Sequence, residues 1–244
     1  MSQNKTLRKL FSEKLSPCLK ELGFKKKNLN FYREDNNHIL IVTGQQSHGR
    51  FFINLGVSLK CYDDFIKYFK KDPQRAEECV YDCRIGNLIK GIIFDKHWNI
   101  YDNLSEEEAS DVIEDVWRDF STYAVPWINL VSTPEGFMEF LESEDKIVPA
   151  KSFLYPIILL CLGQKDKSIV EFETEYKNRL KENLDLIKKS KKGMEELDHF
   201  GYELNYKIGI NCIEEMTRHV KAISKKHDMN MDPDAWLDGV NYKM

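Results

Sequence analysis

Arg50-Phe-Phe-Ile-Asn-Leu-Gly-Val-Ser-Leu59 is the stretch that decides the fold, because its residues alternate in character over ten positions. Every second residue is apolar: Phe51, Ile53, Leu55, Val57 and Leu59. A period of two residues is typical of a β-strand that places one face in a core. The other face carries Phe52, Asn54, Gly56 and Ser58, and is therefore predicted to be more polar.

The neighbouring segments predict partner strands for this one. Residues 38–43 (His-Ile-Leu-Ile-Val-Thr) precede it across a turn that contains Gly49, and residues 29–33 come before them across a polar tetrad at 34–37. Short polar connections of this kind favour antiparallel neighbours. Residues 78–88 and 92–100 also alternate, so we predict an antiparallel meander of about five strands.

Helices are predicted before, within and after the part of the sequence that forms the meander. Leucines and a phenylalanine recur at helical spacing from Leu7 to Leu22, with an interruption at Ser16-Pro17 and an end at Gly23. Residues 62–71 also show a short amphipathic pattern. Ser105 and Glu108 form a capping-box pattern, which predicts a helix that begins there.

The pattern changes near Pro126, after which strand-like alternation almost disappears. Helices are predicted at 133–142, 150–162, 166–192 and 202–225, the last two forming an αα-hairpin, and Trp236 in the tail is expected to pack on this bundle. We therefore predict an α+β fold at residues 1–124, in which a meander of about five strands has flanking helices. An all-α helical region at 125–244 follows it.

Composition predicts a globular cytoplasmic protein. The longest apolar run, residues 153–162, is about half of a membrane span, and no apolar signal region begins the sequence, so we expect no membrane partner. Six scattered cysteines are expected to be reduced in a cytosol.

The net charge of -4 implies no partner by itself, but its distribution is uneven. Residues 5–27 carry eight Lys/Arg against two Glu, whereas 102–119 carry eight Asp/Glu against one Arg.

Several short motifs occur in a recognisable order in the first half of the chain. They are Leu-Gly-Phe-Lys-Lys-Lys (22–27), Asn-Phe-Tyr-Arg (30–33), Gln45-Gln46, Phe-Phe-Ile-Asn-Leu-Gly-Val (51–57), Cys83-Arg-Ile-Gly and the region of Trp98. Together they resemble a bacterial family of domains of unknown function, of the DUF4304 type. The resemblance implies an α+β fold and a bacterial cytosolic protein. It transfers no catalytic residue to this chain.

The sequence predicts no metal and no cofactor. Cys79 and Cys83 are four residues apart on a predicted strand and would face the same way, but a zinc site needs four ligands and the nearest histidine, His97, stands alone. We interpret the two thiols as buried structural residues. No glycine-rich phosphate loop and no nucleophile elbow is present.

Four polar residues form a candidate ligand pocket on the second sheet face: Gln45, Asn54, Arg84 and His97. They would line a concave site in an enzyme or a ligand-binding protein, with His97 near Asp95 and Asp102 as a candidate acid or base. The same residues could instead face solvent or bond to edge backbone. The sequence leaves both interpretations open.

The basic N-terminal segment gives another alternative. Lys25, Lys26 and Lys27 follow a helix and have aromatic neighbours, a combination that nucleic-acid binders use. Core aromatics beside lysines at a solvated helix end would give the same pattern. We therefore keep nucleic-acid binding as an alternative and do not expect it.

The acidic helix is the surface feature that points most directly to a partner. Glu107, Asp111, Glu114 and Asp115 are mainly outward-facing carboxylates that repel one another at helical spacing. Either solubility or attraction of a cationic partner explains them. The leading hypothesis is a non-catalytic, protein-binding bacterial protein, most concretely an immunity-type inhibitor of a toxin enzyme whose cationic domain it would bind.

Overall fold

The computed structural model describes residues 5–27, 29–35, 38–60, 73–89, 96–101, 103–143, 153–197, 200–240 and 242. The chain forms two compact units, unit 1 at 1–151 and unit 2 at 152–244. We expected a boundary after residue 124, whereas the division by compactness lies after 151. The predicted helix at 62–71 lies outside the described residues.

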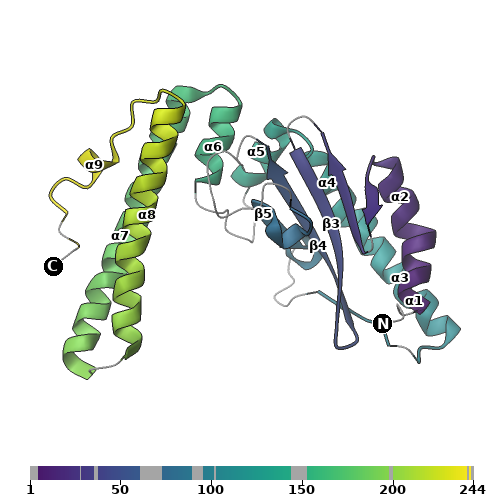
Figure 1. Cartoon of the computed structure of the whole chain (residues 1–244). Coiled ribbons are helices and arrows are strands. Elements are labelled where there is room, and N and C mark those ends of the chain that lie inside the picture. The colour runs from purple at the N-terminus through teal and green to yellow at the C-terminus, as the bar shows by residue number, and fades with distance from the viewer. Residues whose placement is uncertain are drawn as a thin grey trace. The chain divides into compact units, whose positions relative to one another are not determined.

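Unit 1 is built on one antiparallel sheet, and this confirms the predicted α+β fold (Figure 1). The described strands are β1 (Lys25–Lys27), β2 (Asn30–Glu34), β3 (His38–Ser47), β4 (Arg50–Leu59), β5 (Tyr81–Arg84) and β6 (Trp98–Asn99). The strands from β1 to β5 neighbour one another in chain order, as a meander requires, and β6 pairs with β4. The strand β1 was not predicted.

The long β3–β4 hairpin fixes the register of the sheet. Ser47 pairs with Arg50, and His38 pairs with Leu59 at the other end. The two turn residues, His48 and Gly49, have φ values of 51° and 75°. Positive φ at both turn positions matches the right-handed twist of the flanking strands. The turn expected at Gly49 is therefore present.

One sheet face is covered by the N-terminal helical segment. It consists of α1 (Lys5–Leu10), the π-helical turn η1 (Phe11–Leu15) and α2 (Ser16–Glu21). The Phe11 ring stacks on Phe31 with centroids 5.7 Å apart and meets Phe51 edge-on at 6.0 Å. Gly44 allows this approach, because a Cβ there would come within 2.6 Å of the Phe11 ring.

Part of the opposite face is also buried, under a short 3-10 turn, η3 (Ala76–Glu78). A Cβ on Gly56 would lie 2.7 Å from the Ala76 backbone, so the turn lies directly on the strand. Thr43 Oγ1 accepts a hydrogen bond from Ala76 N, and Ser58 Oγ accepts one from Val80 N. The hydroxyl groups on this face therefore hold its cover in place.

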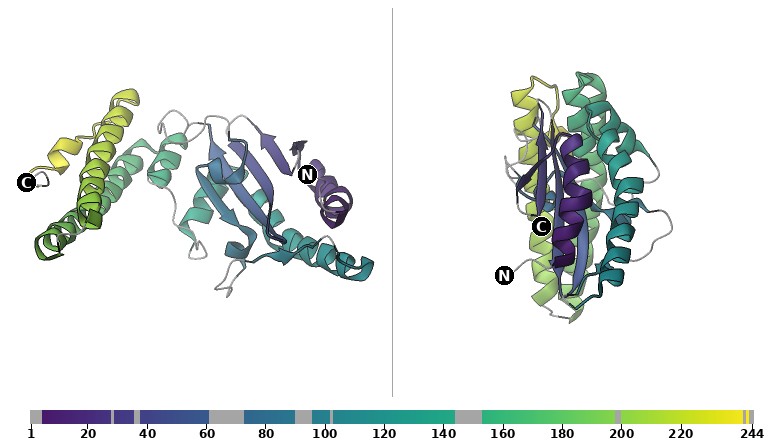
Figure 2. Two further views of the ribbon diagram at one scale, coloured as in Figure 1. Left: turned by 60° about the horizontal axis from the view of Figure 1, so that its bottom comes forward. Right: turned by 90° about the vertical axis from the view of Figure 1, so that its right-hand side faces the viewer.

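Helices after the sheet complete unit 1. They are α3 (Glu106–Asp119), the π-helical turn η5 (Phe120–Ala124), α4 (Val125–Leu130) and α5 (Pro134–Glu142), and Figure 2 shows them beside the sheet. Tyr81 of β5 meets Phe137 and Phe140 of α5 edge-on, at 6.0 and 5.4 Å. Trp127 of α4 also meets Phe140 edge-on, at 6.0 Å. These ring contacts place α4 and α5 in the core of unit 1. They explain why the boundary between the two units lies after residue 151 and not after residue 124.

The prediction for residues 78–88 was wrong in part. Only Tyr81–Arg84 is a strand, and the 3-10 turn η4 (Ile85–Leu88) follows it. Cys83 pairs with Leu55, whereas Cys79 packs against Ile39 and Ile41 beside Gly56. The two thiols therefore lie on opposite sheet faces, because the backbone leaves the strand geometry between them. Of the predicted strand 92–100, residues 92–95 lie outside the described residues.

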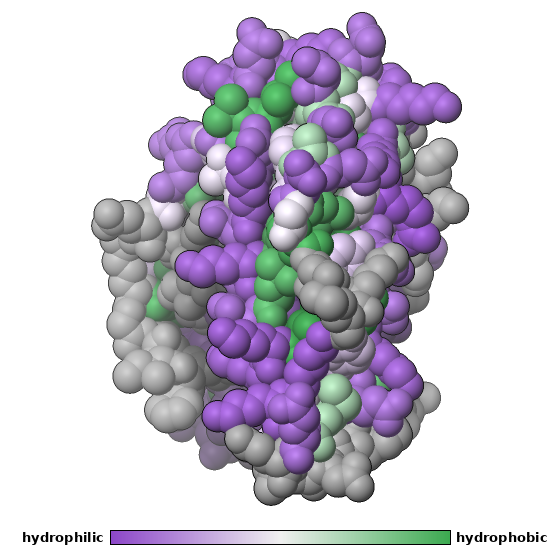
Figure 3. Space-filling model, turned by 90° about the vertical axis from the view of Figure 1, so that its left-hand side faces the viewer, coloured by the Kyte–Doolittle hydropathy of each residue, from purple (hydrophilic) through white to green (hydrophobic). Residues whose placement is uncertain are grey.

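Unit 2 is helical, as predicted. It contains α6 (Leu154–Cys161), α7 (Lys165–Leu197), α8 (Phe200–Lys226) and α9 (Pro233–Trp236). Inside the α7–α8 hairpin, the Tyr176 and Thr217 hydroxyls are hydrogen-bonded at 2.7 Å. Trp236 packs on Tyr176 with ring centroids 5.1 Å apart, as expected for the tail. Figure 3 shows the face on which α9 lies, where polar residues surround narrower apolar areas. No described helix is long and apolar enough to cross a membrane.

Candidate functional site

The acidic helix α3 begins as its sequence predicted. Ser105 Oγ accepts a hydrogen bond from Glu108 N, and the Glu108 carboxylate accepts one from Ser105 N. The bond from Ser105 N to the carboxylate holds the pKa of Glu108 below its usual value. Ile113, Val116 and Phe120 are buried along the inner side of this segment. The outer side of α3 therefore presents the exposed carboxylates, which are those of Glu106, Glu107, Glu108, Asp111 and Glu114.

Asp115 belongs to an internal polar network and is not an open surface carboxylate. Its Oδ2 accepts a hydrogen bond of 3.1 Å from Nε1 of the buried Trp98 on β6. Lys96 lies 3.6 Å from Asp115 and 3.2 Å from the buried Asp119, while Arg118 also pairs with Asp115. The network links α3 to the sheet, so Asp115 has a structural role in this geometry.

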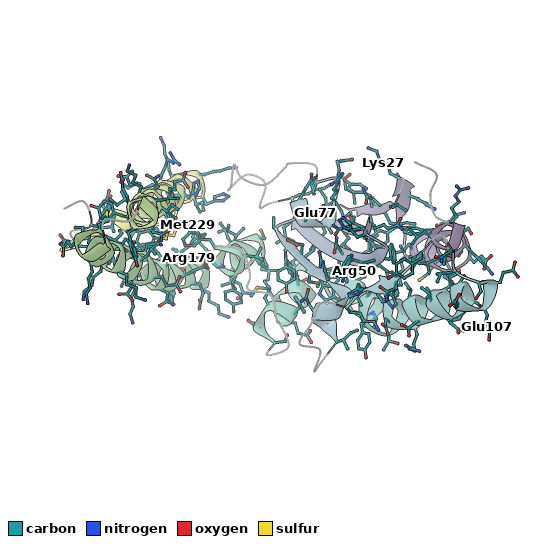
Figure 4. The ribbon with its side chains drawn as sticks, turned by 90° about the horizontal axis from the view of Figure 1, so that it is seen from below. Lys27, Arg50, Glu77, Glu107, Arg179 and Met229 are labelled. Atoms are coloured by element: carbon teal, nitrogen blue, oxygen red, sulfur yellow. The ribbon has the colours of Figure 1, made fainter. Side chains whose placement is uncertain are left out.

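Glu114 is also paired, because Lys14 of the N-terminal helical segment lies 2.7 Å from its carboxylate. Glu107 and Asp111 differ, since both are exposed and no described cation forms an ion pair with either. The structure therefore divides the four predicted partner-binding residues into two pairs. Glu114 and Asp115 connect α3 to other parts of unit 1, whereas Glu107 and Asp111 face outward. Figure 4 shows Glu107 near the outer end of α3.

A hollow of about 600 Å³ lies between α3 and β6. It is lined by His97, Trp98, Asn99, Asp111, Val112, Glu114, Asp115 and Arg118. His97 therefore lies beside the acidic helix, a proximity that its position in the sequence did not indicate. Among the described acids that line this hollow, Asp111 has no ion pair and can meet an incoming positive charge.

The second candidate site is a polar row that crosses the sheet. Asn30 pairs with Thr43, Thr43 with Asn54, and Asn54 with Arg84, so four strands place polar side chains at one level of one face. Asn54 is only 8% exposed, and its Oδ1 has no hydrogen-bond partner in the described part of the chain. The sequence pattern identified Asn54 and Arg84, but missed Asn30.

The four predicted pocket residues surround Phe52. Asn54 Nδ2 donates a hydrogen bond of 3.0 Å to Gln45 Oε1. The Arg84 guanidinium lies 4.4 Å from the Phe52 ring centroid, and the His97 ring lies 5.6 Å from it. They are neighbours, but the described hollows do not unite them: Gln45 lines one and His97 lines the other.

The hollow that contains Gln45 has a volume of about 340 Å³. It is lined by Leu29, Asn30, Thr43, Gly44, Gln45, Gln46, Arg75 and Glu77. Arg75 and Glu77 flank it from the η3 turn and lie 3.7 Å apart. Neither of them was identified from the sequence, because only the turn over the sheet brings them to the polar row.

The three consecutive lysines of the basic N-terminal segment have a structural explanation. Lys25, Lys26 and Lys27 form the exposed edge strand β1, where charged side chains discourage pairing with other chains. Lys26 lies over the Phe11 and Phe31 rings at 5.3 and 5.7 Å and donates to Ser16, and Lys27 donates to Gln74. The expected helix end was wrong here, since these lysines belong to the sheet.

The described residues contain no group of three or more His, Cys, Asp or Glu side chains that could hold a metal ion.

Cys18, Cys79, Cys83 and Cys212 are free thiols, whereas Cys161 is disulfide-bonded. The expectation that all six cysteines are reduced is therefore wrong for Cys161. Burial raises the pKa of the Cys83 thiol, which suits an unreactive core residue.

The fold of unit 1 and the two hollows described above define an α+β protein that carries an acidic helix on one side of its sheet and a polar row on the other. Residues 15–130 match the family model of a domain of unknown function, DUF4304. This match confirms the resemblance over the first half of the chain. No curated protein and no solved structure matches the chain.

Proposed function

We propose that this protein is a non-catalytic, protein-binding protein that recognises a cationic partner through the outer side of α3. The observation that carries the proposal is the contrast within one helix. Glu114 and Asp115 are paired with cations of unit 1, whereas Glu107 and Asp111 are exposed without an ion pair to a described residue. The outer end of α3 thus keeps a negative charge that no described cation of unit 1 neutralises by an ion pair.

Stabilisation of the helix explains only part of this charge. Acidic residues in a first turn interact favourably with the helix dipole, and this accounts for Glu106 to Glu108. Asp111 lies beyond the first turn and lines the hollow next to Trp98. A lysine or arginine of a partner could enter this hollow and meet Asp111 beside an aromatic ring. The concrete form of the proposal is an immunity-type bacterial protein that blocks the basic surface of a toxin enzyme.

Affinity capture from the native host with two baits tests the proposal. The wild-type chain should recover a basic protein, and the double variant Glu107→Gln, Asp111→Asn should bind it roughly 5- to 30-fold more weakly, from about 0.5–1 kcal/mol per charge. The loss should appear mainly as slower association that converges with wild type at high salt. A matched control changes Glu182→Gln and Asp185→Asn, two exposed acids on α7. Equal binding by both double variants would contradict the proposal.

A further inference from the structure

The hollow that contains Gln45, next to the polar row, presents four complementary groups that take no part in the partner binding proposed for α3. It lies on the side of the sheet opposite α3, where Figure 4 shows Glu77 well separated from Glu107. Its rim carries one cation, Arg75, and one anion, Glu77, whose side chains are 64% and 49% exposed. At 3.7 Å their mutual ion pair is long, so each can bind a closer partner.

Two carboxamides that line the hollow, Gln45 and Asn30, add one neutral donor and one neutral acceptor. Asn54 Nδ2 donates to Gln45 Oε1, which leaves Gln45 Nε2 as the donor end of that carboxamide. Asn30 Nδ2 donates to the Gln74 carbonyl, which leaves Asn30 Oδ1 as an acceptor. The two carboxamides are therefore oriented by bonds to neighbouring residues. Side chains fixed in this way bind a ligand at a lower entropic cost.

We propose that this hollow binds a free α-amino acid whose side chain ends in a carboxamide. The ligand carboxylate pairs with the Arg75 guanidinium, and its ammonium pairs with the Glu77 carboxylate. The side-chain carbonyl accepts from Gln45 Nε2, while the side-chain NH₂ donates to Asn30 Oδ1. Each charged and polar end of the zwitterion then has one partner, and the volume of about 340 Å³ suits a small molecule.

The buried amide of Asn54 gives the row a further role. Its Oδ1 is unpaired among the described residues, and an unpaired buried acceptor is unfavourable for stability. The same side chain orients Gln45, so its position serves the hollow more directly than it serves the core. Asn54 is thus a positioning residue for the ligand carboxamide.

Titration of the full ¹⁵N-labelled chain with L-glutamine tests this proposal by NMR. Saturable shifts should appear at Gly44, Gln45 and Gln46. N-acetyl-L-glutamine lacks the ammonium group, and L-glutamate lacks the side-chain NH₂, so each should bind at least about tenfold more weakly. Arg75→Gln and Glu77→Gln should weaken L-glutamine binding by a similar factor. Arg50→Gln, an exposed arginine on β4 outside the hollow, should leave it unchanged.

The ligand series keeps the test decisive even if a variant does not fold. No saturable shift with L-glutamine would overturn the proposal. Equal binding of L-glutamine, its N-acetyl derivative and L-glutamate would also overturn it, because the charge and carboxamide contacts would then have no effect. Since the acidic helix takes no part in this experiment, the result is independent of partner binding.

Discussion

Removal of the Asp115 carboxylate should destabilise unit 1 far more than removal of its exposed neighbour Asp111. Trp98 is 4% exposed, and its Nε1 donates to Asp115, so Asp115→Ala leaves a buried donor without that partner at a cost of about 1–3 kcal/mol. The ion pairs with Lys96 and Arg118 involve a side chain that is 35% exposed, and their loss adds about 0.2–1 kcal/mol.

Two further variants separate these contributions. Asp115→Asn keeps an oxygen acceptor for Trp98, so it should lose only the ion-pair part, about 0.2–1 kcal/mol. Asp111→Ala is the matched control on the same helix, because it brings the same change in helix propensity without a buried partner and should cost less than about 0.5 kcal/mol. Urea unfolding followed by tryptophan fluorescence measures all three. Equal destabilisation by Asp115→Ala and Asp111→Ala would refute the argument that the network anchors α3.

Gly56→Ala should destabilise unit 1 by about 1–3 kcal/mol in the same assay, because the new Cβ would lie 2.7 Å from the Ala76 backbone; a loss below about 0.5 kcal/mol would show that η3 moves freely. Burial lowers the pKa of His38, although nearby Asp35 opposes this, so the unfolded chain binds this proton more readily. The contribution of neutral His38 to the free energy of unfolding should therefore be fully present above about pH 6.5, and it should be lost as the pH decreases toward the lower folded pKa. The variant His38→Gln should show a weaker dependence of the urea midpoint on pH over this range. Alkylation of the native, unreduced protein should modify the exposed Cys212 before the buried Cys79 and Cys83, and should modify Cys161 only after reduction; early labelling of Cys83 would contradict its burial.

Local patterns in the sequence determined the elements of unit 1 that depend on periodicity. The alternation of residues 50–59 predicted β4 and its apolar face, and the capping residues predicted where α3 begins. The helices of unit 2 were also foreseen, since their apolar stripes repeat at helical spacing. Such features depend on residues that are close in the chain, so they are visible without tertiary information.

Tertiary structure decided which polar side chains are paired and which remain available. Glu107 and Asp115 have the same character in the sequence, but Lys96 and Trp98 contact Asp115 and not Glu107, because β6 pairs with β4 beside α3. Arg75 and Glu77 join Asn30 and Gln45 only because the η3 turn folds over the sheet. Contacts between residues far apart in the chain leave no local periodic signal, and these contacts distinguish a binding surface from a structural network.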